Sequence, residues 1–118
     1  MKKDEISAID AIYEALDILS TLDKRLSVIE DNIKILNKLP SNLKYLECQF
    51  NLLDTLTNLP LKLQYLDCSN NILTTLKNIP KNLIHLNCSS NKLTYLVNLP
   101  DTLEYIDYWN NDFIDLDL

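Results

Sequence analysis

The twenty residues Lys81–Pro100, KNLIHLNCSSNKLTYLVNLP, decide how this chain folds. Moved back by twenty positions they align with LKLQYLDCSNNILTTLKNIP at 61–80, and by forty with SNLKYLECQFNLLDTLTNLP at 41–60. Moved forward they align with DTLEYIDYWNNDFIDLDL at 101–118. A fixed period of this length is typical of repeat architectures, in which each repeat buries its apolar face only by stacking on its neighbours. We therefore expect a solenoid.

Each repeat reads L-x-x-L-x-C-x-x-N-x-L-x-x-L, followed by L-P or I-P. The alternation at Leu46 and Cys48 predicts a short strand in the first half. Counted from the first Leu of each repeat, positions one, four, six, eleven and fourteen should face inward, and positions two, three, five, seven and eight outward. Twenty residues leave no room for a return helix, so the second half should be extended or polyproline-like. The recurrent Asn at position nine should satisfy backbone groups of the turn and its neighbouring Asn side chains, because an amide offers two donors and one acceptor.

The two ends of the chain depart from this pattern. Residues 4–20 carry apolar side chains at helical spacing, which predicts a capping helix within 1–20. Residues 21–40 fit either a second helix or a degenerate first repeat, and we favour the repeat because terminal repeats are usually atypical. The repeat array is therefore expected at 21–118, with 101–118 as a terminal partial repeat. Its end should be capped by its own residues, pair with another copy, or continue in a longer protein.

Composition excludes several classes of function. The chain has 118 residues, enough for one domain, and no Gly, so it has no Gly-rich phosphate loop and its turns need Asn, Asp, Ser or Pro. Residues 101–118 hold six acids and no base, which disfavours nucleic acid and leaves a basic protein partner open. No apolar run is long enough for a membrane span and no secretory signal is present, so we expect a cytoplasmic protein.

Neither a cofactor nor a catalytic site is expected. Three Cys recur at position six, where they should form a ladder in the core. The alternative, a metal site, needs ligands that converge on one point, and side chains one repeat apart do not. The single His, His85, has no nucleophile or orienting partner at motif spacing. We therefore predict no enzyme activity and no metal.

This pattern resembles the leucine-rich-repeat family over residues 41–118, and more weakly over 21–40. The length of twenty residues and the L-P in the repeats resemble the short bacterial-type class, found in effectors of animal pathogens. Similar Cys-bearing repeats occur in proteins of amoeba-infecting giant viruses. The resemblance implies an α/β fold, a right-handed solenoid with a parallel sheet on its concave face. It also implies a protein-recognition surface, whereas the ubiquitin-ligase domain of some bacterial members would not fit in this chain.

The outward positions of the sheet supply the candidate site. Position three carries aromatic rings and position five mostly carboxylates, a combination that suits an interface with a basic protein. Alternatively, the rings only stabilise the sheet by stacking on one another, the acids only keep the face soluble, and Trp109 covers the end of the core. We expect a monomeric protein-interaction module, in the host cytosol if the source is a pathogen or virus, with self-association through the C-terminal edge as the alternative. The candidate contacts are Tyr45, Glu47, Phe50, Tyr65, Asp67, Ile84, His85, Asn87, Tyr105, Asp107 and Trp109.

Overall fold

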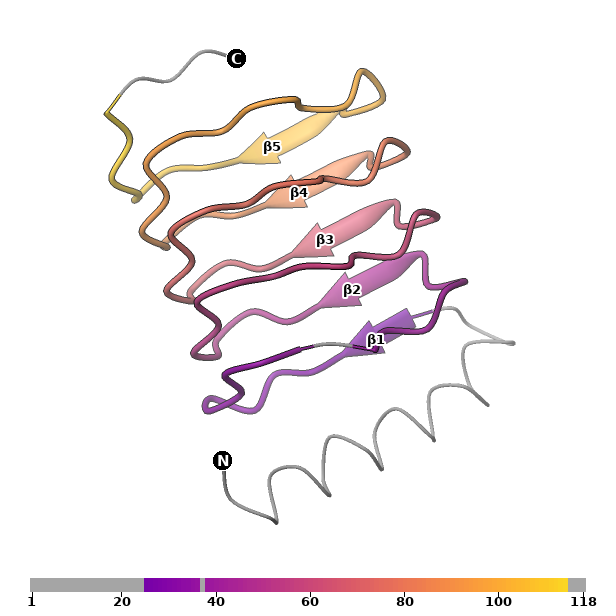
Figure 1. Ribbon diagram of the computed structural model, residues 1–118, viewed down its shortest axis with the longest axis horizontal. Helices are drawn as coiled ribbons and strands as arrows, with labels where there is room; N and C mark the ends of the chain where they lie inside the picture. Colours follow the sequence, from indigo (N-terminus) through magenta and orange to yellow (C-terminus); the bar gives the residue numbers. More distant parts are fainter. Residues whose placement is uncertain (1–24, 37, 115–118) are drawn as a thin grey trace.

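The computed structural model describes residues 25–36 and 38–114, and within them the chain forms one five-stranded parallel sheet (Figure 1). The strand order β1-β2-β3-β4-β5 follows the sequence. Each strand pairs with the next at an offset of one repeat, so that Tyr45 lies opposite Tyr65 and Leu46 opposite Leu66. The strands are β1 (Arg25–Ser27), β2 (Tyr45–Glu47), β3 (Tyr65–Asp67), β4 (His85–Asn87) and β5 (Tyr105–Asp107).

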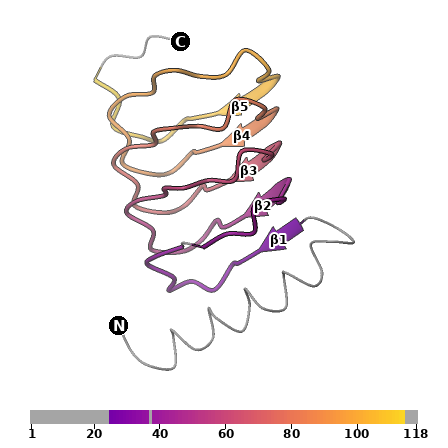
Figure 2. The same cartoon turned by 45° about the vertical axis from the view of Figure 1, so that its right-hand side comes forward.

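Each strand begins one coil of a solenoid, and we number coils 1 to 5 after their strands. The return segments lie across from the strands and stack in the same order (Figure 2). Within the described residues these returns contain neither helix nor strand, in line with the extended return predicted from the repeat length. The helix expected at 4–20, and with it the helical part of the α/β prediction, lies outside the described residues.

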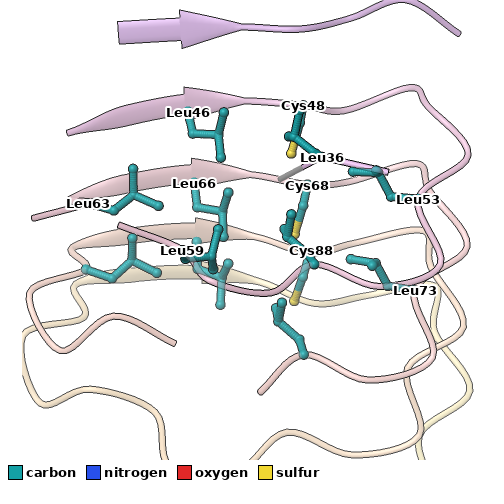
Figure 3. Packing of buried hydrophobic residues seen from close by; sticks show 14 of the residues in the cluster. Leu36, Leu46, Cys48, Leu53, Leu59, Leu63, Leu66, Cys68, Leu73 and Cys88 are labelled. Carbon is teal, nitrogen blue, oxygen red and sulfur yellow. The ribbon is translucent and has the colours of Figure 1, made fainter. Parts of the chain in front are cut away.

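The core lies between the strands and the returns, and the predicted inward positions fill it (Figure 3). In coil 3, Leu63, Leu66, Cys68 and Leu73 are fully buried. Burying a Leu side chain stabilises a fold by about 1.5–3 kcal/mol, so one coil stacked on its neighbours gains several such contributions. The inward positions of coil 5 that the structure describes, Leu103, Ile106, Tyr108 and Phe113, are only partly buried, because coil 4 covers them on one side.

The described part of residues 21–40 is a coil of the solenoid and not a second helix. Its strand β1 pairs with β2 in the common register, with Leu26 opposite Leu46. Val28, Ile33 and Leu36 are buried where Cys48, Leu53 and Leu56 lie in the next coil. The proposed domain boundaries themselves remain predictions.

Coils 1 to 4 each contain two sharp turns with a left-handed backbone and the described part of coil 5 contains one, and Asn supplies five of these nine positions. In the return segments, Asn58, Asn78 and Asn98 have φ between 55° and 56°. After the strands, Asn70 and Asn110 have φ of 56° and 58°. Asn tolerates this conformation better than most residues, which explains how a chain without Gly makes these turns.

The recurrent Asn at position nine binds the backbone, as its spacing predicted. Asn91 donates from Nδ2 to the carbonyl oxygens of Cys68 in the preceding coil and Cys88 in its own coil, at 3.0 and 3.2 Å. Its Oδ1 accepts the Leu73 N–H at 3.0 Å. Each such side chain therefore joins two coils. No hydrogen bond joins one of these Asn side chains to another within the described residues, so that part of the prediction was wrong.

Candidate functional site

Five side chains at position three form one continuous stack on the outward face of the sheet. The ring centroids of Tyr45 and Tyr65 are 4.0 Å apart, and those of Tyr65 and His85 are 4.3 Å apart. His85 and Tyr105 follow at 4.3 Å. At the other end, Cζ of Arg25 lies 4.7 Å from the centroid of Tyr45. We call Arg25, Tyr45, Tyr65, His85 and Tyr105 the aromatic column.

Strand register explains this geometry. An offset of one repeat places every third-position side chain over the next, about 4.8 Å away along the sheet. Rings at this spacing stack in parallel, and the three interplanar angles lie between 5° and 16°. The column therefore contributes to the stability of the sheet, as the alternative interpretation of the Tyr row expected. It also remains accessible, since Tyr45, Tyr65 and His85 are only partly buried and Tyr105 is 49% exposed.

Position five forms a polar row beside the column. Glu47, Asp67 and Asp107 are carboxylates, and Asn87 interrupts them. Asp67 and Asp107 both act electrostatically on His85, which places their charges next to the rings. The polar row and the aromatic column together give the outward face both negative charge and aromatic surface.

In coils 3 and 4, position seven differs from the prediction that it faces outward. Ser69 and Ser89 are buried, with 4% and 5% of their surface exposed. The Ser69 hydroxyl donates to Oδ1 of Asp67 at 2.7 Å, and the Ser89 hydroxyl donates to Oδ1 of Asn87 at 2.7 Å. These serines orient the position-five side chains and do not offer surface to a partner.

His85 is held in its neutral form by its surroundings. Burial between neighbouring rings lowers the pKa of His85, because it disfavours the imidazolium. Asp67 and Asp107 act in the opposite direction but do not compensate. Burial also raises the pKa of Tyr65, and a hydrogen bond with Tyr45 and the nearby carboxylates add to this effect. At neutral pH the charge of this face therefore comes mainly from the carboxylates.

Three apolar candidates flank the strands. Phe50 follows β2 and is 52% exposed, with a φ of 58°. Trp109 follows β5 and is 66% exposed, whereas Ile84 precedes β4 and is 36% exposed. All eleven predicted contact residues thus lie on the strands or within three residues of a strand end. Arg25 was not among them, although the twenty-residue period places it in register with Tyr45.

The Cys ladder lies in the core. Cys48, Cys68 and Cys88 are free and buried. Burial raises the pKa of Cys48 and of Cys88 to about 12, so both thiols stay protonated at neutral pH. In the described residues no group of three or more His, Cys, Asp or Glu side chains is placed to hold a metal ion.

Comparison with solved structures places this architecture in a family. YopM from Yersinia enterocolitica WA-314, a leucine-rich-repeat effector, is 36% identical to this chain, covers 80% of it and superposes with a TM-score of 0.76. This chain is a leucine-rich-repeat protein. It spans 21% of the YopM chain. No protein-family model matches the leucine-rich-repeat array, and neither does any curated protein.

The array contains no membrane-spanning helix in its described part. None of its segments there is a helix with the length and apolar character needed to cross a bilayer.

Proposed function

We propose that this leucine-rich-repeat array is a non-enzymatic module that binds a partner protein on the outward face of its sheet. The observation that carries the proposal is the aromatic column with carboxylates alongside. Exposed aromatic rings on a rigid sheet bury much apolar area at small entropic cost when a partner covers them. The similarity to the effector YopM supports a role in protein recognition.

Phe50 also supports binding at this face. Left-handed backbone costs a residue with a Cβ about 1–2 kcal/mol, and Asn occupies the equivalent position in coils 3 and 5. An aromatic side chain that is kept at this cost and left half exposed is better explained by binding than by folding. Phe50 therefore extends the proposed interface along the end of β2.

The charge of the face indicates a basic partner. Glu47, Asp67 and Asp107 would pair with Lys or Arg side chains that come close to the rings. A cytosolic location, in a host cell if the source is a pathogen, fits both this chemistry and the similarity to a bacterial effector.

Catalysis by His85 has no support in its surroundings. Tyr65 and Tyr105 stack on its two faces. Among the described residues, no Ser, Thr or Cys is hydrogen-bonded to it as a nucleophile would be. We therefore assign His85 to the binding face.

The proposal is tested with a purified partner, first identified by affinity capture from the cells in which the protein acts. Calorimetry compares the unaltered chain with the triple variant Y65A/H85A/Y105A. The control is Val97→Ser, which changes an exposed side chain of the return segment. We expect the triple variant to lose at least tenfold in affinity and the control to be unchanged. Unchanged affinity in a folded triple variant would exclude the outward face as the binding site.

Self-association is the second candidate function. Leu103, Ile106 and Phe113 are only partly buried in coil 5, so apolar surface remains at that edge. Its acids oppose close approach of a second copy. Light scattering at increasing concentration distinguishes the two functions, and we expect the mass of a monomer throughout.

A further inference from the structure

Asp107 differs from the other residues of the polar row. In coils 3 and 4, a Ser at position seven donates to the position-five side chain, and in coil 2 Nε2 of Gln49 donates to Glu47 at 3.4 Å. In coil 5, Trp109 takes the place of the Ser and offers no side-chain hydroxyl. Within residues 25–36 and 38–114 the Asp107 carboxylate accepts no hydrogen bond. It is thus available to a donor from outside the chain.

Tyr105 differs from the other rings of the aromatic column. His85 stacks on one face of its ring at 4.3 Å. With 49% of its surface exposed, Tyr105 is the most accessible of the four rings. The outer face of a phenol ring attracts cations through its quadrupole.

The opposite end of the column shows which group completes such a stack. There, the guanidinium of Arg25 lies over the Tyr45 ring, with 4.7 Å between Cζ and the centroid. A guanidinium is planar, weakly hydrated and always charged, so it stacks on a ring while its N–H groups still reach a carboxylate. Lys is a strongly hydrated point charge and does this less well.

We propose that Tyr105 and Asp107 form a docking site for an arginine side chain of the partner protein. The inference rests on the proposed function of the outward face. The guanidinium stacks on the open face of Tyr105, continues the column, and donates to the Asp107 carboxylate. Residues 101–118 contain six acids and no base, so this end of the chain attracts a cation.

A second copy of the chain is a poorer occupant of this site. The sequence contains one Arg, and that residue already lies over Tyr45 of its own chain. Two acidic C-terminal ends would also repel each other.

The test uses the full chain and three blocked tripeptides, glycine–arginine–glycine and its analogues with citrulline or lysine. Binding is followed by the fluorescence of Trp109, the single Trp, and by amide chemical shifts. We expect weak saturable binding of the arginine peptide, with shifts concentrated at residues 105–109. The lysine peptide should bind more weakly, and the uncharged citrulline peptide should not bind measurably.

Two matched variants assign the site. Asp107→Asn copies the Asn87 of coil 4, so the fold should tolerate it, and Asp67→Asn removes an equal charge from a carboxylate that already has a Ser donor. We expect Asp107→Asn to weaken arginine binding about threefold or more, and Asp67→Asn to weaken it less. Equal effects of the two variants, shifts elsewhere, or equal binding of citrulline would overturn the proposal.

The purified partner separates this inference from the proposed function. If Y65A/H85A/Y105A abolishes binding and Asp107→Asn leaves it unchanged, the arginine site is wrong and the binding face stands. If neither variant changes affinity, both fail.

Discussion

The side-chain amide of Asn71 joins two coils, because its Nδ2 donates to the carbonyl oxygens of Cys48 in coil 2 and Cys68 in coil 3, both at 3.1 Å. Its Oδ1 accepts the Leu53 N–H at 2.9 Å. Asn71 is 7% exposed, so water does not readily replace these bonds. The stacking of coils depends on this side chain as well as on the apolar core.

Replacing Asn71 by Ala should therefore be strongly destabilising. It leaves buried backbone groups without partners, and we expect the free energy of unfolding to fall by about 2–4 kcal/mol. Urea unfolding followed by circular dichroism measures this change. The control is Asn111→Ala in coil 5, where the same hydrogen bonds are only part-buried and water can substitute. A larger loss at Asn111 would contradict this account.

Phe50→Asn should stabilise the fold and weaken partner binding. The substitution places at φ 58° the residue found in coils 3 and 5, and we expect a gain of about 0.5–1 kcal/mol in the free energy of unfolding. Thermal unfolding measures the gain, and calorimetry with the purified partner measures the loss of affinity. Asn78→Ala, at φ 55°, should have the opposite effect on stability. If Phe50→Asn is destabilising, the side chain contributes packing that outweighs its backbone cost.

His85 should make stability depend on pH. The pKa of His85 is lowered in the folded protein, so between that value and its ordinary value of about 6.5 the unfolded chain binds more protons. The contribution of His85 to stability is therefore present above about pH 6.5 and lost as the pH falls through the folded pKa. Asp67 and Asp107 act on the ring in the opposite direction and reduce the effect. The pKa of Tyr65 is raised, so that ring stays neutral in this range.

The variant His85→Tyr isolates the contribution of His85 to the pH dependence of stability, because the neighbouring coils carry Tyr at the same position and the fold should tolerate it. Chemical unfolding at about pH 7.5 and about pH 5 should show a smaller loss of stability for the variant than for the unaltered chain. An equal or greater loss in the variant would show that His85 does not titrate in this range.

The thiols should be unreactive until the protein unfolds. Burial raises the pKa values of Cys48 and Cys88 to about 12, and burial together with the two neighbouring Cys raises the pKa of Cys68 well above its ordinary value. Because the thiolate is the reactive form, a colorimetric thiol reagent at about pH 8 should label the folded chain very slowly and the chain in urea at once. Rapid labelling of any one Cys under native conditions would contradict its burial.

Much of the fold was predictable from the sequence because each repeat contains the same pattern of Leu, Cys and Asn. The inward positions, the strand in each repeat and the extended return follow from the spacing of Leu, Cys and Asn, and the structure confirms them from coil 2 to coil 4. The row of aromatic rings was predictable as well, since an exact period places equivalent side chains over one another. The eleven contact residues remain a prediction as a binding site.

Other features depend on contacts that no single repeat encodes. The sequence of 21–40 fits a helix or a coil, and pairing of Arg25 with Tyr45 in register decides for the coil. The sequence pattern predicts that Ser69 and Ser89 are exposed on the outward face, but both are buried and donate hydrogen bonds to Asp67 and Asn87.

The sequence by itself determined the period, and with it the stacking of coils, because only a neighbouring repeat can cover the apolar side of each repeat. The tertiary structure decided which side chains of the face have neighbours on both sides and which do not. Asp67 and Asp107 occupy the same position in their repeats, but in the described part of the chain a Ser hydroxyl donates to Asp67 and none donates to Asp107. Tyr65 and Tyr105 also occupy the same position in their repeats, yet Tyr65 has a ring on each face, whereas within the described residues Tyr105 stacks on His85 alone. Whether a side chain is accessible depends on its neighbours in space, and these neighbours differ between side chains at the same position of different repeats.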